Sequence, residues 1–153
     1  MMFKRIRNYF KNQKGLTLVE LLAVIVILGI IAAIAVPSIG KIMENSKKDA
    51  HVSNAQQILG AAKLAVASKD PISTGTDNTM TLGELHTAGF IEEIPVSPKT
   101  NVAYDSTTSK VVIDTTATGG FLYKVTLVDS GNTVINGETA QSLAKAGRDL
   151  VSE

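Results

Sequence analysis

An apolar run that contains a single carboxylate constrains this chain more than any other feature. The residues from Leu21 to Val36 are all apolar or glycine, and Glu20 is the one formal charge between Lys14 and Lys41. As an α-helix, the stretch from Leu16 to Val36 would be about 31 Å long, close to the thickness of a bilayer's hydrocarbon core. A carboxylate within a membrane helix costs about 2.5–3.5 kcal/mol on insertion scales, so Glu20 requires a cation at matching depth.

The segment before this run is basic. It contains five of the fifteen basic residues and no acidic one: Lys4, Arg5, Arg7, Lys11 and Lys14. These charges predict a cytoplasmic N-terminus, with the remainder of the chain outside the membrane. The other ten basic and fourteen acidic residues give residues 16–153 a net charge of −4, a poor overall match for nucleic acid or anionic lipid. Cysteine is absent, which excludes disulfides and thiolate metal sites.

A helical pattern continues beyond the apolar run. Pro37 removes one backbone hydrogen bond, yet apolar residues then recur mostly at spacings of three and four, with Val52 and Leu64 off the stripe. We therefore expect one helix over residues 16–68, with a membrane-spanning first half and an amphipathic second half. Asp70-Pro71 is expected to end it.

The remaining residues indicate a small mixed head. Thr81 and Glu84 fit a capping box for a short helix over residues 82–88, after a polar loop over residues 72–79. Turn residues separate three predicted strands, which favours an antiparallel meander: Lys110–Thr115, Phe121–Val128 and Thr133–Asn136. A terminal helix is expected within Thr139–Val151. The predicted fold class is α+β, a long N-terminal helix packed on a small antiparallel sheet.

The N-terminal segment resembles that of a known family. The order Gly15-Leu-Thr-Leu-Val-Glu20, then Leu21 through Val36, then Pro37, is similar to the prepilin segment of type IV pilins and pseudopilins. A second stretch, Gly89 to Lys99, resembles the link between helix and sheet in many Gram-positive pilins and major pseudopilins. The chain departs from the family in having Leu16 where phenylalanine is commonest. It also lacks the C-terminal cysteine pair of many Gram-negative pilins, which favours a Gram-positive source or a pseudopilin.

The resemblance implies a processing and assembly pathway. A prepilin peptidase would remove residues 1–15 by cutting between Gly15 and Leu16, and would methylate the new amine of Leu16. An assembly ATPase and a membrane platform protein would then move subunits into an extracellular filament with other copies and minor pilins. The resemblance also implies that the helix loosens between Gly29 and Pro37 within the filament, since both residues weaken it.

The expected role of Glu20 combines the family's pathway with the chain's own charges. Cleavage creates a positive amine on Leu16, and the amine of an incoming subunit can meet Glu20 of one already assembled. Removing one partner of such a buried pair costs about 3–5 kcal/mol. Glu20 is therefore expected to direct assembly rather than to catalyse a reaction. The expected parts are the leader at residues 1–15, the core helix at 16–37, its amphipathic continuation at 38–70 and the head at 71–153.

Several alternatives remain open at this point. A pilus subunit is the leading interpretation, with a pseudopilin of a type II secretion or competence machine next. A signal peptide cleaved at Ala33-Ile-Ala35, or an uncut signal anchor carrying an exported domain, would also explain the basic leader and the apolar run. DNA binding lacks support, because aromatic residues beyond the leader are few: Phe90, Tyr104, Phe121 and Tyr123.

No pattern in the sequence indicates an enzyme, a cofactor or a metal. His51 and His86 have no ligand spacing around them and are expected to be surface or partly packed residues. Asp114, Asp129 and the adjacent Glu92-Glu93 pair lack the arrangement of a general acid and base. The chain also has no nucleophile elbow and no phosphate loop. The expectation is a structural subunit.

Overall fold

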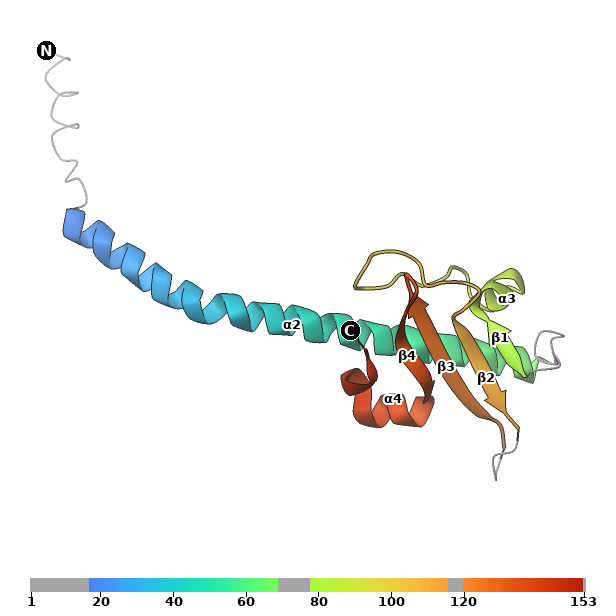
Figure 1. The fold of residues 1–153 in the computed structure, drawn as a ribbon. Coiled ribbons are helices and arrows are strands. Elements are labelled where there is room, and N and C mark those ends of the chain that lie inside the picture. The colour runs from blue at the N-terminus through green and yellow to red at the C-terminus, as the bar shows by residue number, and fades with distance from the viewer. Residues whose placement is uncertain (1–16, 69–77, 116–119, 153) are drawn as a thin grey trace, which may run out of the picture. The chain divides into compact units, whose positions relative to one another are not determined.

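The computed structural model describes residues 17–68, 78–115 and 120–152 (Figure 1). The chain divides into two compact units, Met1–Ile42 and Met43–Glu153, and the boundary falls inside the long helix. The expected end of that helix at Asp70-Pro71 lies outside the described residues.

Helix α2, Leu18–Ala67, is continuous through Pro37 and confirms the long helix expected from the sequence. In its first half the large apolar side chains from Leu18 to Val36 are all exposed in the isolated chain. Among the described residues it is the one helix long and apolar enough to cross a membrane. Such exposure in one continuous stretch indicates a surface that lipid or protein covers.

The second half of α2 packs its apolar stripe on the head. The stripe includes Ala55, Ile58, Leu59 and Ala62, which are completely or almost completely buried. Val52, expected off the stripe, is also buried, because the helix meets the head on a face broad enough to include it. Leu64 is exposed as expected, and the Glu44–Lys48 pair forms with a separation of 3.3 Å.

The sheet has four antiparallel strands in the order β1-β2-β3-β4: Thr79–Thr81, Lys110–Asp114, Leu122–Asp129 and Asn132–Thr139. The last three correspond to the predicted meander. The sequence interpretation missed β1 and placed Thr79 in a loop, because a three-residue strand with a single apolar residue has too short a pattern to recognise. Met80 pairs with Val111, and both side chains are fully buried.

The turn between β3 and β4 lies at Ser130 and Gly131, between two of the predicted strands. Ser130 and Gly131 have φ angles of 49° and 84°, in the left-handed region that glycine tolerates best. This turn brings β4 back beside β3, with Asp129 opposite Asn132 at its mouth. The turn thus places the Asp129 carboxylate at one end of the sheet.

Helix α3, Leu82–Thr87, begins with the predicted capping box. The Glu84 backbone N–H donates to Thr81 Oγ1 at 3.2 Å, and Glu84 Oε2 accepts from the Thr81 N–H at 2.7 Å. The two contacts satisfy backbone donors that a helix start otherwise leaves unpaired. The capping box also joins the last residue of β1 to α3.

Loss of this cap gives a modest stability change. Thr81→Ala is expected to lower the free energy of unfolding of the head by about 1 kcal/mol, because the Glu84 N–H loses its side-chain acceptor. Thr87→Ala, at the other end of the same helix, removes only a bond to the Gly83 carbonyl and is expected to change stability by less than about 0.5 kcal/mol. Urea unfolding of both variants measures the difference, and equal midpoints would contradict the assignment.

The C-terminal α-helix is shorter than expected. Helix α4 spans Ala140–Ala146, and a 3₁₀ turn, η3, follows over Gly147–Leu150. Gly147, with φ of 53°, leaves the helical conformation and ends α4 before the expected boundary. The Arg148 guanidinium then contacts Asp49 of α2 at 2.8 Å, and the Ser152 N–H donates to the Val134 carbonyl of β4.

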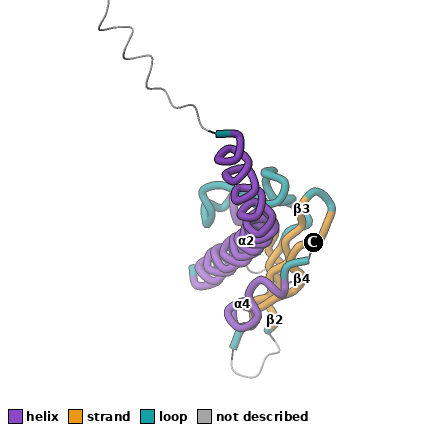
Figure 2. The backbone as a smooth tube through the Cα atoms, turned by 90° about the vertical axis from the view of Figure 1, so that its left-hand side faces the viewer, coloured by secondary structure: helices purple, strands orange, loops and turns teal. Residues whose placement is uncertain are grey.

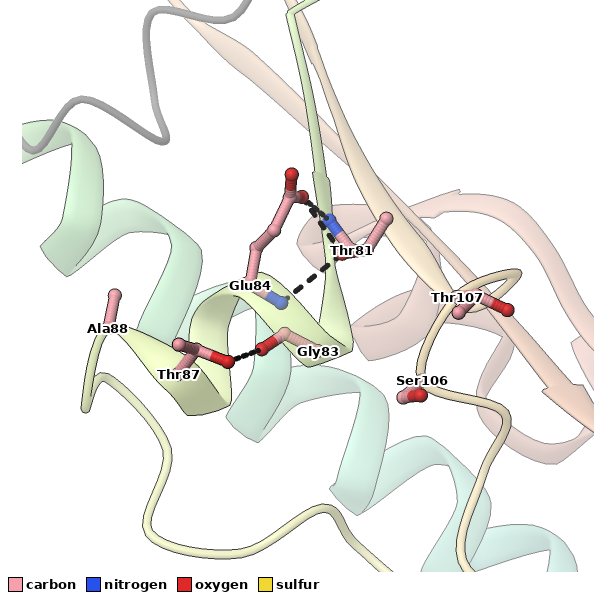
Figure 3. A pocket seen from close by; sticks show the side chains of 7 residues that line it. All are labelled: Thr81, Gly83, Glu84, Thr87, Ala88, Ser106 and Thr107. Atoms are coloured by element: carbon pink, nitrogen blue, oxygen red, sulfur yellow. Dashed lines mark hydrogen bonds between the residues drawn. The ribbon is translucent and has the colours of Figure 1, made fainter.

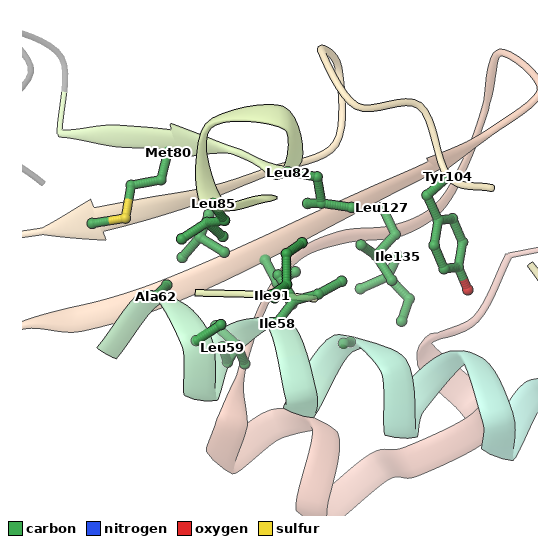
Figure 4. Close-up of a cluster of buried hydrophobic side chains, with 14 of the residues drawn as sticks. Ile58, Leu59, Ala62, Met80, Leu82, Leu85, Ile91, Tyr104, Leu127 and Ile135 are labelled. Carbon is green, nitrogen blue, oxygen red and sulfur yellow. The ribbon is translucent and has the colours of Figure 1, made fainter. Parts of the chain in front are cut away.

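The core lies between α2 and one face of the sheet (Figures 1 and 2). Ile58, Leu59 and Ala62 point from the helix toward Leu127 and Ile135 of the strands (Figure 4). Leu82, Leu85 and Ile91 close the cluster from α3 and the segment after it. This arrangement confirms the α+β fold expected from the sequence.

Candidate functional site

Glu20 lies in the first turn of α2 and takes part in a capping box with Thr17. Glu20 Oε2 accepts hydrogen bonds from the backbone N–H and from the hydroxyl of Thr17, each at 2.8 Å. In return the Glu20 N–H donates to Thr17 Oγ1 at 3.2 Å. The carboxylate therefore stabilises the start of the helix and also interacts favourably with the helix dipole.

The sequence analysis missed the role of Thr17, although the signal was present. Thr17 and Glu20 have the same spacing as Thr81 and Glu84, which predicts a capping box at both places. The box orients the carboxylate without neutralising it. Among the described residues no cation pairs with Glu20, and its neighbours Leu18 and Val19 are 81% and 70% exposed. A charge thus remains at the start of an apolar helix.

The expected cleavage and methylation site lies outside the described residues. Gly15 and Leu16 precede Thr17, the first residue that the structure describes. Cleavage after Gly15 and methylation of Leu16 therefore stay predictions. The sequence nevertheless places the amine of Leu16 next to Thr17, one residue from the capping box.

Pro37 lies within an unbroken helix, and the next residue, Ser38, makes a side-chain hydrogen bond back to the preceding turn. Pro37 has no N–H, so the carbonyl four residues earlier loses its usual donor. The Ser38 hydroxyl donates to the Ile34 carbonyl at 2.9 Å, a contact that often accompanies bending of a helix. At Gly29, an added Cβ would meet no atom within 4 Å. Loosening of this stretch in a filament stays a prediction for the assembled state.

In the head, Asp129 is a buried hydrogen-bonding centre. Its Oδ2 accepts from the Ser97 hydroxyl, and its Oδ1 accepts from the hydroxyls of Thr100 and Ser130 at 2.7 and 3.0 Å. Burial opposes the charged form, but these hydrogen bonds outweigh it and hold the pKa of Asp129 below its usual range. The carboxylate therefore joins the segment before β2 to the β3–β4 turn.

His51 differs from its expected position at or near the surface. It is 2% exposed, and its Nδ1 forms a hydrogen bond with the hydroxyl of Tyr104, which is equally buried. The ring lies on the face of α2 that meets the head, a position that the spacing of the apolar residues did not assign to it. His86, in contrast, is exposed as expected.

The other acidic residues considered from the sequence do not converge. The Asp114 carboxylate lies 3.2 Å from the Lys124 ammonium on the neighbouring strand. Glu92 and Glu93 are both exposed in the segment after α3. These positions give each carboxylate a separate local environment.

A shallow depression lies between α3 and the loop before β2 (Figure 3). Its volume is about 390 Å³, and its lining is rich in hydroxyl groups: Thr81, Gly83, Glu84, Thr87, Ala88, Ser106 and Thr107. The Glu84 carboxylate points back to Thr81, as the capping box requires. The hydrogen bonds of Thr81, Glu84 and Thr87 thus serve α3, while Thr107 donates to Asp105 within the loop before β2.

Comparison with known proteins bears on the N-terminal segment. Residues 10–36 match the family described as prokaryotic N-terminal methylation motif. The chain is also similar to the type IV major pilin protein PilA of Myxococcus xanthus (strain DK1622), at 35% identity over 69 residues. That match covers 45% of this chain and 31% of the relative, so less than a third of the relative's length is compared. No solved structure matches the chain.

The matched motif contains Glu20 and the sequence-predicted Gly15 and Leu16, and it ends one residue before Pro37. It therefore covers the capping box and the exposed apolar half of α2. The structure thus combines the matched motif with the long apolar helix and the antiparallel sheet that were expected from the sequence. The chain carries the prokaryotic N-terminal methylation motif and is similar over 69 residues to a type IV major pilin.

Proposed function

We propose that this chain is a structural subunit of a type IV pilus, with no catalytic activity of its own. The observation that carries the proposal is the methylation motif at residues 10–36 on a helix whose apolar side chains are exposed in the isolated chain. The chain would be held in the membrane by this helix, with its N-terminus in the cytoplasm and its head outside. Assembly would then place the head on the cell surface.

Helix packing in a filament supplies a second environment for the same apolar surface. Lipid and neighbouring helices are similarly apolar, so transfer from one to the other loses little hydrophobic stabilisation. The free-energy cost of this transfer comes from the charge of Glu20. The carboxylate makes capping hydrogen bonds but has no paired cation among the described residues. A methylated amine on Leu16 of an adjoining copy would supply that cation, because methylation retains the positive charge.

A pseudopilin of a secretion or DNA-uptake machine is the alternative function. It would share the cleavage motif, the membrane helix and the assembly mechanism, and would differ in the length of the filament. Negative-stain microscopy of sheared cells, with antibodies against residues 71–153, separates the two. Long labelled filaments support a pilus, and labelled material confined to the envelope supports a pseudopilus.

Processing at Gly15 provides the direct test. Mass spectrometry of the chain purified from its own cells is expected to show a mature N-terminus at methylated Leu16. Gly15→Val is expected to abolish this product, because the cleavage site would carry a β-branched side chain, whereas Lys14→Gln retains Gly15 and is expected to be cut. A mature chain that begins at Met1 or at Val36 would show an uncut anchor or a secreted domain and would refute the proposal.

A further inference from the structure

The pair of buried rings, His51 and Tyr104, joins two parts of the head that are far apart in the sequence. Their ring centres lie 5.8 Å apart, and each residue is 2% exposed. His51 belongs to α2, while Tyr104 lies in the connection between α3 and β2. The hydrogen bond between them therefore fixes that connection to the helix.

Further polar contacts hold the same connection, here named the latched segment, residues 96–104. The Asn54 side-chain amide of α2 donates to the Val96 carbonyl at 3.2 Å and reaches the Tyr104 hydroxyl at 3.5 Å. At the opposite side, Asp129 holds the hydroxyls of Ser97 and Thr100. The latched segment is thus held by side-chain hydrogen bonds at both sides, and Tyr104 at its end also belongs to the buried core.

Burial opposes the protonation of His51 more strongly than its neighbouring charges favour it. On α2, Lys47 and Lys48 lie one turn before it, while Asp49 is paired with Arg148 of η3. Across from the helix, the latched segment contributes Lys99 and β3 contributes Asp129. Burial is the largest influence and lowers the pKa of His51 below 6.5, Asp129 acts in the opposite direction, and Lys99 lowers it further.

The groups beside His51 offer few free hydrogen-bond acceptors for a protonated imidazole. A protonated imidazole donates from both nitrogens and needs two acceptors. The oxygens of Asp129 already accept from three hydroxyls. Burial raises the pKa of Tyr104 to about 12, so its hydroxyl keeps its proton and offers no negative charge. Protonated His51 would therefore be buried without an anionic partner of its own.

We propose that His51 and Tyr104 form a pH-sensitive latch, which holds residues 96–104 on α2 at neutral pH and releases them in mildly acidic solution. The released segment exposes His51 to water, where its proton is fully hydrated. This device lies in the head and does not depend on whether the chain forms a pilus or a pseudopilus. It would let a surface-exposed subunit change one face in response to external acid.

The sign of the effect follows from the lowered pKa. Because His51 in the closed head binds a proton less readily than in the released state, protons favour release. The latch is at full strength above the ordinary histidine value of 6.5 and weakens as the pH falls below it. Asp129, whose pKa is also lowered, weakens only at far lower pH, below its ordinary value of 3.8. The two groups can thus be distinguished by the pH at which protection is lost.

Hydrogen exchange of the full-length chain in detergent micelles tests the latch. At about pH 5, compared with about pH 7.5, the amides of Ser97, Asn101 and Tyr104 are expected to lose about tenfold in protection after correction for intrinsic exchange. The amides shared by β2 and β3 should keep their protection, because these strands do not depend on His51. Equal protection of the latched segment at both pH values would overturn the proposal.

The two histidines of the chain provide matched variants. His51→Asn places an amide near the position of Nδ1 and removes the titration, so the acid-dependent loss is expected to disappear. His86→Asn changes an exposed histidine and is expected to retain the full response. A response that persists in His51→Asn would contradict the latch.

One measurement does not require the His51 variant to fold. In His86→Asn, His51 is the only histidine, so its proton resonances can be followed during an NMR pH titration. The expected pKa lies below 6.5. A value at or above that figure would overturn the proposal even if the His51 variant were unstable.

Discussion

Glu20→Gln is expected to abolish filaments while leaving the chain cleaved after Gly15 and inserted in the membrane. Glutamine keeps an oxygen that can accept from the Thr17 N–H and hydroxyl, so the capping box survives. It removes the charge that would pair with the amine of a neighbouring copy. Leaving that amine unpaired in an apolar core costs about 3–5 kcal/mol at each contact, enough to prevent assembly.

Glu20→Ala and Thr17→Ser separate the charge from the cap. Glu20→Ala removes both and is expected to give no filaments, whereas Thr17→Ser keeps both and is expected to assemble as the wild type does. Counting filaments on sheared cells, with immunoblots for mature chain in the membrane, gives the measurement. Wild-type filament numbers from Glu20→Gln would show that the carboxylate matters only as a helix cap, and the proposed ion pair would be wrong.

The long helix and the meander could be predicted because their signals are local and repeated. The apolar run, the spacing of residues such as Ile58 and Leu59, and the turn at Ser130-Gly131 each lie within a short window of sequence. The structure confirms these elements with boundaries shifted by a few residues. β1 was missed because its three residues contain only Met80 as an apolar signal.

The buried polar groups could not be predicted, because their partners are distant in sequence. His51 and Tyr104 are separated by 53 positions, and Ser97 and Asp129 by 32. Nothing local distinguishes a buried histidine on a helix from one at the surface. The Thr17 cap is different, because its spacing to Glu20 is local and by itself predicts a capping box.

Leu59→Ala is expected to lower the free energy of unfolding of the head by about 2–5 kcal/mol. Leu59 is 1% exposed and lies between α2 and the sheet, so truncation leaves a cavity as well as a loss of apolar burial. A head with a total stability of about 5–15 kcal/mol would lose a large part of it. In this variant the second half of α2 would also separate from β3 and β4 more readily than in the wild type.

Leu64→Ala is the matched control, because it is the same substitution on the same helix. Leu64 is 58% exposed in the isolated chain, so its truncation is expected to change stability by less than about 0.5 kcal/mol. Pulse proteolysis of the full-length chain across a urea series measures both variants against the wild type. If the two leucines gave equal losses, α2 would not pack on the sheet through the face that contains Leu59. Since the same face positions His51 and Asn54 against residues 96–104, the latch would then lose its geometric basis as well.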